Sequence, residues 1–150
     1  MSDFSILLNW QRTTPDFEYK TFNRDHTWRL AGGQVVRGSA AAEYSGDPEM
    51  SNPGEALLAA LSSCHMLTFL SIAALKKLVV ESYEDEPLAE LGKNEKGKMM
   101  VSHLTLRPRV VFSADTTPDP DTVRELHRKA KENCFIGNSL LSSVTLEPRF

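Results

Sequence analysis

Cysteine is scarce in this chain, which holds two among its 150 residues. Two cysteines are too few for the disulfide framework of a small secreted domain, although they are enough for one reactive pair. An excess of charge of one sign is also missing, because the formal net charge is only −3. The sequence therefore lacks the basic footprint of a nucleic-acid-binding protein, and we expect no nucleic-acid partner.

The first ten residues have no basic region, no long apolar core and no small-residue cleavage site. We therefore expect no signal peptide and a cytoplasmic protein, whose thiols rest in the reduced state. Hydrophobic residues make up 41% of the chain and charged residues 25%, which is typical of a soluble globular protein. The length favours a single domain over residues 1–150.

One charge-free run, residues 57–75, is long enough to cross a bilayer. Five polar side chains within it argue against a membrane span, namely Ser62, Ser63, His65, Thr68 and Ser71. A helix that is apolar on all sides is equally typical of the centre of a soluble core. We expect the second arrangement, and no membrane association.

The pattern of strand and helix signals predicts an α+β protein with the order β-β-β-α-β-β-α-β. Gly32-Gly33 marks a two-residue hairpin turn between two of the first strands. Asn52 and Glu55 form a capping-box signal around Pro53 at the start of the long helix. The expected strands are 3–11, 25–31, 35–43, 79–90, 99–113 and 142–148, and the expected helices run from Asn52 to about Leu78 and onward from Pro118.

The two cysteines lie on the apolar faces of the two predicted helices, 70 residues apart. One interpretation is a pair of buried structural cysteines, and the other is a redox pair. Cys64 is about eleven residues into its helix, too deep to feel the N-terminal dipole, so a nearby cation would have to activate it. Cys134 lies near a helix C-terminus, where the dipole disfavours a thiolate. This asymmetry makes Cys64 the better nucleophile and Cys134 the better resolving thiol.

Other reactive arrangements have weaker signals. His65 adjoins Cys64 but points about 100° away around the helix, which disfavours a cysteine–histidine nucleophile. The remaining histidines have no short ligand spacing with the cysteines, so we expect no metal and no cofactor. The charged run 81–86 is interpreted as a solvated strand edge.

Three segments carry a resemblance to a known family. The sequence resembles the OsmC/Ohr family of thiol peroxidases from about residue 20 to residue 148, through FNRDHTW, NPGEALLAALSSCHM and ENCFIGNSLLSSVTLEP. The resemblance implies an OsmC-like fold and an intertwined homodimer with the long helices buried centrally. It also implies that Cys64 attacks an organic hydroperoxide, that Cys134 resolves the sulfenic acid to a disulfide, and that a dithiol reductant such as dihydrolipoamide regenerates the thiols.

The same resemblance implies that Arg24 holds the Cys64 thiolate. The family's carboxylate partner for this arginine directly follows the helix-opening proline, where this chain has Gly54. Glu55 is one position further, so it either orients Arg24 or only caps the helix with Asn52. We therefore list Cys64, Cys134, Arg24 and Glu55 as candidate catalytic residues.

Apolar residues near both cysteines predict a pocket that favours alkyl or aryl hydroperoxides over hydrogen peroxide. These residues are Met66, Leu67, Phe69, Phe135 and Ile136. Two alternatives to a peroxidase remain open: a non-catalytic binding protein for a small apolar ligand, and a thiol redox sensor that passes its disulfide to a partner.

Overall fold

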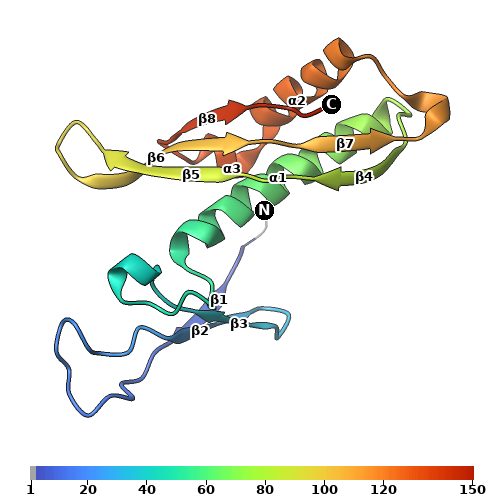
Figure 1. Ribbon diagram of the computed structural model, residues 1–150. Helices are drawn as coiled ribbons and strands as arrows, with labels where there is room; N and C mark the ends of the chain where they lie inside the picture. The colour runs from blue at the N-terminus through green and yellow to red at the C-terminus, as the bar shows by residue number, and fades with distance from the viewer. Residues whose placement is uncertain (1–2) are drawn as a thin grey trace. The chain divides into compact units, whose positions relative to one another are not determined.

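The computed structural model describes residues 3–150, which divide into two compact units. The first unit ends at Ala56, and the second runs from Leu57 to Phe150. Each unit has strands of its own (Figure 1). The expectation of one domain over residues 1–150 stays a prediction.

The first unit is built on a three-stranded antiparallel sheet in the order β1-β2-β3. The predicted hairpin is confirmed, but its turn has three residues, 31–33, rather than two, because the Leu30 N–H donates to the Gln34 carbonyl. Gly33 has a φ of +93°, a backbone conformation that glycine adopts without a steric penalty. The third strand ends at Gly38 rather than residue 43, and the Ser39 N–H then donates a hydrogen bond to the Ser51 carbonyl. The strands are β1 (Ile6–Asn9), β2 (His26–Leu30) and β3 (Val35–Gly38), followed by the short 3-10 helix η1 (Ala42–Tyr44).

The long helix α1 (Pro53–Leu75) ends three residues before the predicted Leu78. Lys77 has a φ of +59°, the left-handed conformation that terminates many helices. The backbone N–H of Leu78 donates to the Ala73 carbonyl, and that of Lys77 donates to the Ala74 carbonyl. These two bonds form a Schellman motif, which satisfies carbonyls at the helix end.

Each of the two long strands predicted in the second half is divided into two shorter ones. Residues 79–90 give β4 and the start of β5, which continues to Lys93, and residues 99–113 give β6 and β7. Pro87 lies at the first break and Pro108 at the second, and a proline has no N–H to donate to a strand ladder. The bounds are β4 (Val80–Glu84), β5 (Leu88–Lys93), β6 (Met99–Leu106), β7 (Arg109–Phe112) and β8 (Ser143–Leu146).

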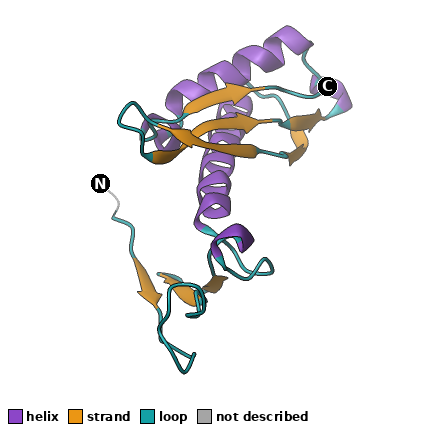
Figure 2. Cartoon of the chain, turned by 60° about the vertical axis from the view of Figure 1, so that its left-hand side comes forward, coloured by secondary structure: helices purple, strands orange, loops and turns teal. Residues whose placement is uncertain are grey.

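The strands of the second unit form two small sheets. In one, β4 pairs with β7; in the other, β6 pairs with β5 in antiparallel and with β8 in parallel orientation. The helices α2 (Pro120–Asn133) and α3 (Phe135–Asn138) stand between η2 (Ala114–Thr116) and β8. Asp119 caps α2 by accepting from the Thr122 N–H at 2.7 Å. Figure 2 shows these strands on one side of α1 and α2, and the α+β class is confirmed.

Two buried clusters hold the second unit together, and α1 contributes to both. The first cluster consists of Phe69, Ala73, Phe112, Val123, Leu126 and Ala130. The second consists of Leu61, Cys64, Leu104, Leu106 and Cys134. By length and composition alone α1 could cross a membrane, a test that the core helix of a soluble protein also passes. Its apolar surface is only partly buried within the chain, and Leu67 on it is 59% exposed.

Candidate redox site

The fold brings the two cysteines together. Cys64 lies in the middle of α1, one turn after Leu61, and Cys134 lies at the junction of α2 and α3. Both belong to the second buried cluster, and both are free thiols, 8% and 1% exposed respectively. The Cys64 side chain lies close enough to Cys134 to raise the pKa of the Cys134 thiol. The packing of α2 and α3 against α1 therefore brings together two thiols that are 70 residues apart in sequence.

The environment of Cys134 favours its protonated form. Burial raises the pKa of the Cys134 thiol, and the neighbouring Cys64 raises it further. The Gly137 N–H donates to Cys134 Sγ at 3.4 Å and acts in the opposite direction, with a smaller effect than burial. Cys134 is consequently a neutral thiol at pH 7. A neutral thiol is a weaker nucleophile than a thiolate, which suits a residue that reacts second, after its partner has been oxidised.

A small cavity of about 70 Å³ lies beside Cys134, lined by Leu61, His65, Leu106, Lys131, Cys134, Gly137, Asn138 and Val144. A drug-sized ligand needs several hundred Å³, so this space accommodates only a very small group. Ile136 packs against the cluster of the two thiols, whereas Phe69 belongs to the other cluster and Phe135 is 61% exposed. The predicted apolar pocket is thus not assembled by all five residues within this unit.

A pair of buried histidines joins the same two helices. His65 Nε2 and His127 Nδ1 are 3.0 Å apart, and the two rings are stacked at 9° with centroids 5.3 Å apart. Burial lowers the pKa of His65 to about 4 and that of His127 to about 3, so both imidazoles are neutral at pH 7. The negative charge of Asp85 raises the pKa of His65 and so partly opposes the effect of burial. Each neutral imidazole carries one N–H, so one ring donates to the other.

The histidine pair was not predicted from the sequence, although the sequence carries a signal for His127. His127 lies at helical spacing with Val123 and Ala130, in the apolar stripe of α2. A histidine in such a stripe is buried and needs a hydrogen-bond partner. Nothing in the sequence indicates that the partner is His65, 62 residues earlier.

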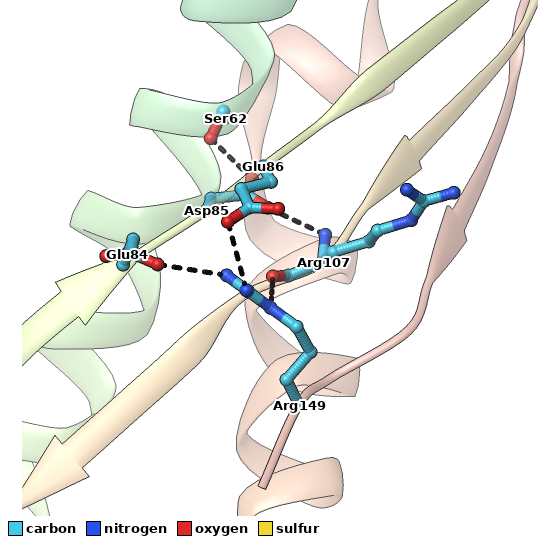
Figure 3. A network of polar contacts seen from close by, with 6 residues as sticks. All are labelled: Ser62, Glu84, Asp85, Glu86, Arg107 and Arg149. Atoms are coloured by element: carbon cyan, nitrogen blue, oxygen red, sulfur yellow. Dashed lines mark hydrogen bonds and ion pairs between the residues drawn. The ribbon is translucent and has the colours of Figure 1, made fainter.

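Asp85 connects α1 to the break between β4 and β5 (Figure 3). Its carboxylate accepts from the Ser62 hydroxyl and from the Arg107 N–H, both at 2.6 Å. Arg149 lies beside it, donates to the Arg107 carbonyl at 2.8 Å, and points toward Glu84 and Glu86. The charged run 81–86 is therefore more than a solvated edge, because Asp85 within it holds α1 one half-turn before Cys64.

Arg24 lies in the first unit, on the segment between β1 and β2. Its guanidinium donates to the carbonyls of Phe22 at 2.7 Å and Tyr19 at 2.5 Å, and it lies over the Phe22 ring at 3.7 Å. The ion pairs found among residues 3–150 do not include one between Arg24 and Glu55. The side chain is therefore held by its own loop, and its role toward Cys64 stays a prediction.

Glu55 and Asn52 form a reciprocal capping box at the start of α1. The Asn52 N–H donates to Glu55 Oε1, and the Glu55 N–H donates to Asn52 Oδ1, both at 3.0 Å. This is the capping role that the sequence signal indicated. One carboxylate oxygen of Glu55 is thereby engaged in the helix end, and its second predicted role, orienting Arg24, is untested.

Comparisons with known proteins bear on the fold and the family of the chain. The model of the OsmC-like protein family matches residues 46–149. An OsmC-like protein of unknown function from Vibrio cholerae is 42% identical and superimposes with a TM-score of 0.95, over 99% of this chain and 100% of that chain. An uncharacterized protein of Bacillus subtilis, YmaD, is 26% identical over 127 residues, 83% of this chain and 84% of its own length.

A more distant structure shares the fold alone. The organic hydroperoxide resistance protein OhrB of Bacillus subtilis is 16% identical, with a TM-score of 0.71 over 99% of this chain and 98% of that chain. The family match covers most of the chain, including both cysteines. It confirms the resemblance indicated by the cysteine-bearing segments, and the chain belongs to the OsmC-like protein family.

Proposed function

We propose that this protein is a thiol-dependent peroxidase that reduces organic hydroperoxides to alcohols. The observation that carries the proposal is the contact between Cys64 and Cys134 in one buried cluster, with both thiols free. Two structural cysteines would need no contact with each other. A pair of thiols in contact can instead give up two electrons to an oxidant by forming one disulfide.

The proposed cycle has three balanced steps. The Cys64 thiolate attacks the terminal, hydrogen-bearing peroxide oxygen and the O–O bond breaks, which gives a sulfenic acid on Cys64. The departing alkoxide takes a proton from solvent and leaves as the alcohol. The sulfur of Cys134 then attacks the sulfur of Cys64, the S–O bond breaks, and water leaves with the Cys134 proton. A dithiol reductant, such as dihydrolipoamide, reduces the Cys64–Cys134 disulfide by exchange and becomes a disulfide itself.

Arg24 is proposed as the cation that holds the Cys64 thiolate and stabilises the departing oxyanion. Glu55 is proposed to support it, in the place of the family carboxylate that Gly54 has replaced. The assignment of Arg24 rests on the family resemblance, and that of Glu55 on its place one position after Gly54. Within the first unit Arg24 contacts its own loop and Glu55 caps α1, so the proposal requires Arg24 to exchange these contacts for Cys64.

The working form is proposed to be a cytoplasmic homodimer. Exposed apolar side chains support this, since Ile6, Leu7 and Leu8 of β1 and Leu67 and Leu75 of α1 are all more than half exposed in the single chain. Such a surface is typical of an obligate interface. Sedimentation over a wide dilution range tests it, and a compact folded monomer at micromolar concentration would contradict it.

The proposed activity is tested by mixing the reduced protein with cumene hydroperoxide and counting free thiols. We expect one equivalent of peroxide to convert two thiols into one disulfide, detected by thiol titration and by mass spectrometry. Cys134→Ser serves as the matched control, because it should consume one equivalent and stop at a sulfenic acid that a dimedone probe traps. Unchanged thiols in the native protein would contradict the proposal.

The alternatives are a non-catalytic binding protein and a redox sensor, and two features at the start of α1 favour a protein without peroxidase turnover. Gly54 stands where the family has a carboxylate, and Glu55 is engaged in the capping box. If these features have abolished peroxidase turnover, the thiols should still exchange with a protein disulfide. A mixed disulfide trapped on Cys64 in Cys134→Ser, without peroxide consumption by the native protein, would identify the sensor.

A further inference from the structure

Two polar contacts link α1 to the segment that carries Cys134, and the proposed cycle uses only one of them. The first is the contact between the thiols. The second is the hydrogen bond between His65 and His127. His65 directly follows Cys64 on α1, and His127 precedes Cys134 by seven residues, about two turns of α2. Each imidazole is therefore fixed to the backbone that presents one of the thiols.

We propose that the His65–His127 hydrogen bond is a positioning contact that holds Cys64 and Cys134 at the separation needed for disulfide formation, an inference that rests on the redox cycle proposed above. A disulfide requires its two Cα atoms within about 4.4–6.8 Å and a narrow range of dihedral angles. Apolar contacts in the surrounding cluster have little directional preference, whereas an N–H···N bond of 3.0 Å fixes both distance and angle.

The surroundings of the pair make it rigid. The His127 ring stacks on Phe69 with centroids 4.3 Å apart, and Tyr83 meets His127 edge-on at 6.4 Å. On the other helix, Ser62 is held by Asp85 at 2.6 Å. Cys64 thus lies between two fixed points on α1, Ser62 bound to the strand break and His65 bound to α2. A thiol between two such points keeps its place while its partner approaches.

Burying the two imidazoles lowers the stability of the folded protein, which favours a positioning role over simple packing. Both imidazoles are 1% exposed, and burial lowers the pKa of each. His127 Nε2 is buried and has no hydrogen-bond partner among residues 3–150, which destabilises the folded state because the atom has lost its hydration. Two apolar side chains would fill the same space without this cost, but they would lose the directional bond.

The experiment separates the two chemical steps in the intact protein. Reduced protein is mixed with cumene hydroperoxide in a stopped-flow instrument; Cys64 oxidation gives a phase proportional to peroxide, and disulfide formation gives a phase independent of it. In His127→Leu we expect the second phase to be ten- to a hundredfold slower and the first to stay within twofold, because small misplacements of reacting groups are that costly. His127→Asn, whose amide can replace Nδ1, should recover most of the rate.

Tyr83→Phe is the matched control. The Tyr83 hydroxyl is buried beside the same rings and has no partner among residues 3–150, so its removal should leave both phases unchanged. If His127→Leu does not fold, the double variant His65→Leu/His127→Leu, which leaves no imidazole unpaired, replaces it with the same expectation.

A second readout does not depend on peroxide chemistry. The Cys64–Cys134 disulfide is equilibrated with a dithiothreitol redox buffer, and in His127→Leu we expect its formation constant to fall at least tenfold, about 30 mV in reduction potential. A folded leucine variant with the native second phase and the native potential would overturn the positioning role. Failure of the native protein to react with peroxide, combined with the expected shift in potential, would overturn the peroxidase and leave the positioning role standing.

Discussion

The first turn and the middle of α1 are held by contacts of different range. Asn52 and Glu55 cap the first turn across three residues of sequence, through two bonds of 3.0 Å. The middle is held by Asp85, 23 residues from Ser62, by His127, 62 residues from His65, and by Cys134, 70 residues from Cys64. The first turn can therefore form with the helix itself, whereas the contacts in the middle of the helix form only when the second unit is packed.

The largest expected effect comes from breaking the thiol contact. Cys64→Ser should abolish peroxide reduction completely, because it removes the proposed nucleophile. Cys134→Ser should permit a single turnover, because the pKa of the buried Cys134 thiol is raised and its proposed role comes second. Peroxide consumption and sulfenic-acid trapping measure this. If Cys134→Ser instead prevented the first reaction while Cys64→Ser retained it, the two assignments would be reversed.

A second prediction concerns acid stability, which the histidine pair should dominate. In the folded protein the pKa of His65 is lowered to about 4 and that of His127 to about 3, while both have ordinary values near 6.5 when unfolded. Between these values the unfolded state binds more protons, so the free energy of unfolding should fall as pH drops below about 6.5 and continue to fall toward pH 4. The expected loss attributable to the pair is on the order of several kcal/mol.

Denaturant unfolding of the native protein and of His65→Leu/His127→Leu at a series of pH values measures this loss. The double variant keeps the other titrating groups, so the difference between the two pH profiles isolates the pair. We expect that difference to be nearly constant above pH 7 and to favour the variant increasingly in acid. Parallel profiles over the whole range would show that the pair does not control acid stability.

A smaller effect is expected at the first turn. Glu55→Ala should lower the free energy of unfolding by about 1 kcal/mol, because the Asn52 N–H loses its acceptor. If capping is the only role of Glu55, the rate of Cys64 oxidation in the folded protein should barely change. A tenfold slower oxidation, about 1.4 kcal/mol of barrier, would show that Glu55 also supports Arg24. Glu55→Gln is the control, since its amide oxygen can still accept from Asn52.

The smallest effect on stability is expected at Gly54. Replacing glycine within a helix commonly stabilises by up to about 1 kcal/mol, and a carboxylate in the first turn adds a favourable charge. Here a new Cβ would lie 3.2 Å from the capping oxygen of Asn52, so part of this gain should be lost. Gly54→Glu should therefore shift the free energy of unfolding by less than about 1 kcal/mol, with Gly54→Ala as the steric control.

The kinetic consequence of Gly54→Glu is more informative than its stability. If Arg24 activates Cys64 and lacks a partner, the new carboxylate should increase the rate of Cys64 oxidation. Stopped-flow oxidation by an organic hydroperoxide measures this, with Arg24→Ala alongside it. An unchanged rate in Gly54→Glu together with full activity in Arg24→Ala would remove Arg24 from the proposed mechanism.

The sequence determined the features that depend on neighbouring residues. The Gly32-Gly33 hairpin, the capping box of α1 and the proline-led start of α2 were all predicted, because turn and cap geometry is encoded within a few positions. The strand breaks at Pro87 and Pro108 were encoded locally too, but the predicted strands ran through them. The family followed from the segments around the two cysteines, over the region that the family model also matches.

Only the tertiary structure decided which distant groups meet. Helical spacing placed both cysteines on apolar faces, yet the contact of Cys64 with Cys134 depends on how α2 and α3 pack against α1. The same packing pairs His65 with His127 and lowers the pKa of both. It also brings Asp85 to Ser62, whose hydroxyl donates to the carboxylate. The physical reason is that periodicity shows which face of an element is buried, whereas burial, desolvation and long-range hydrogen bonds arise only where two such faces meet.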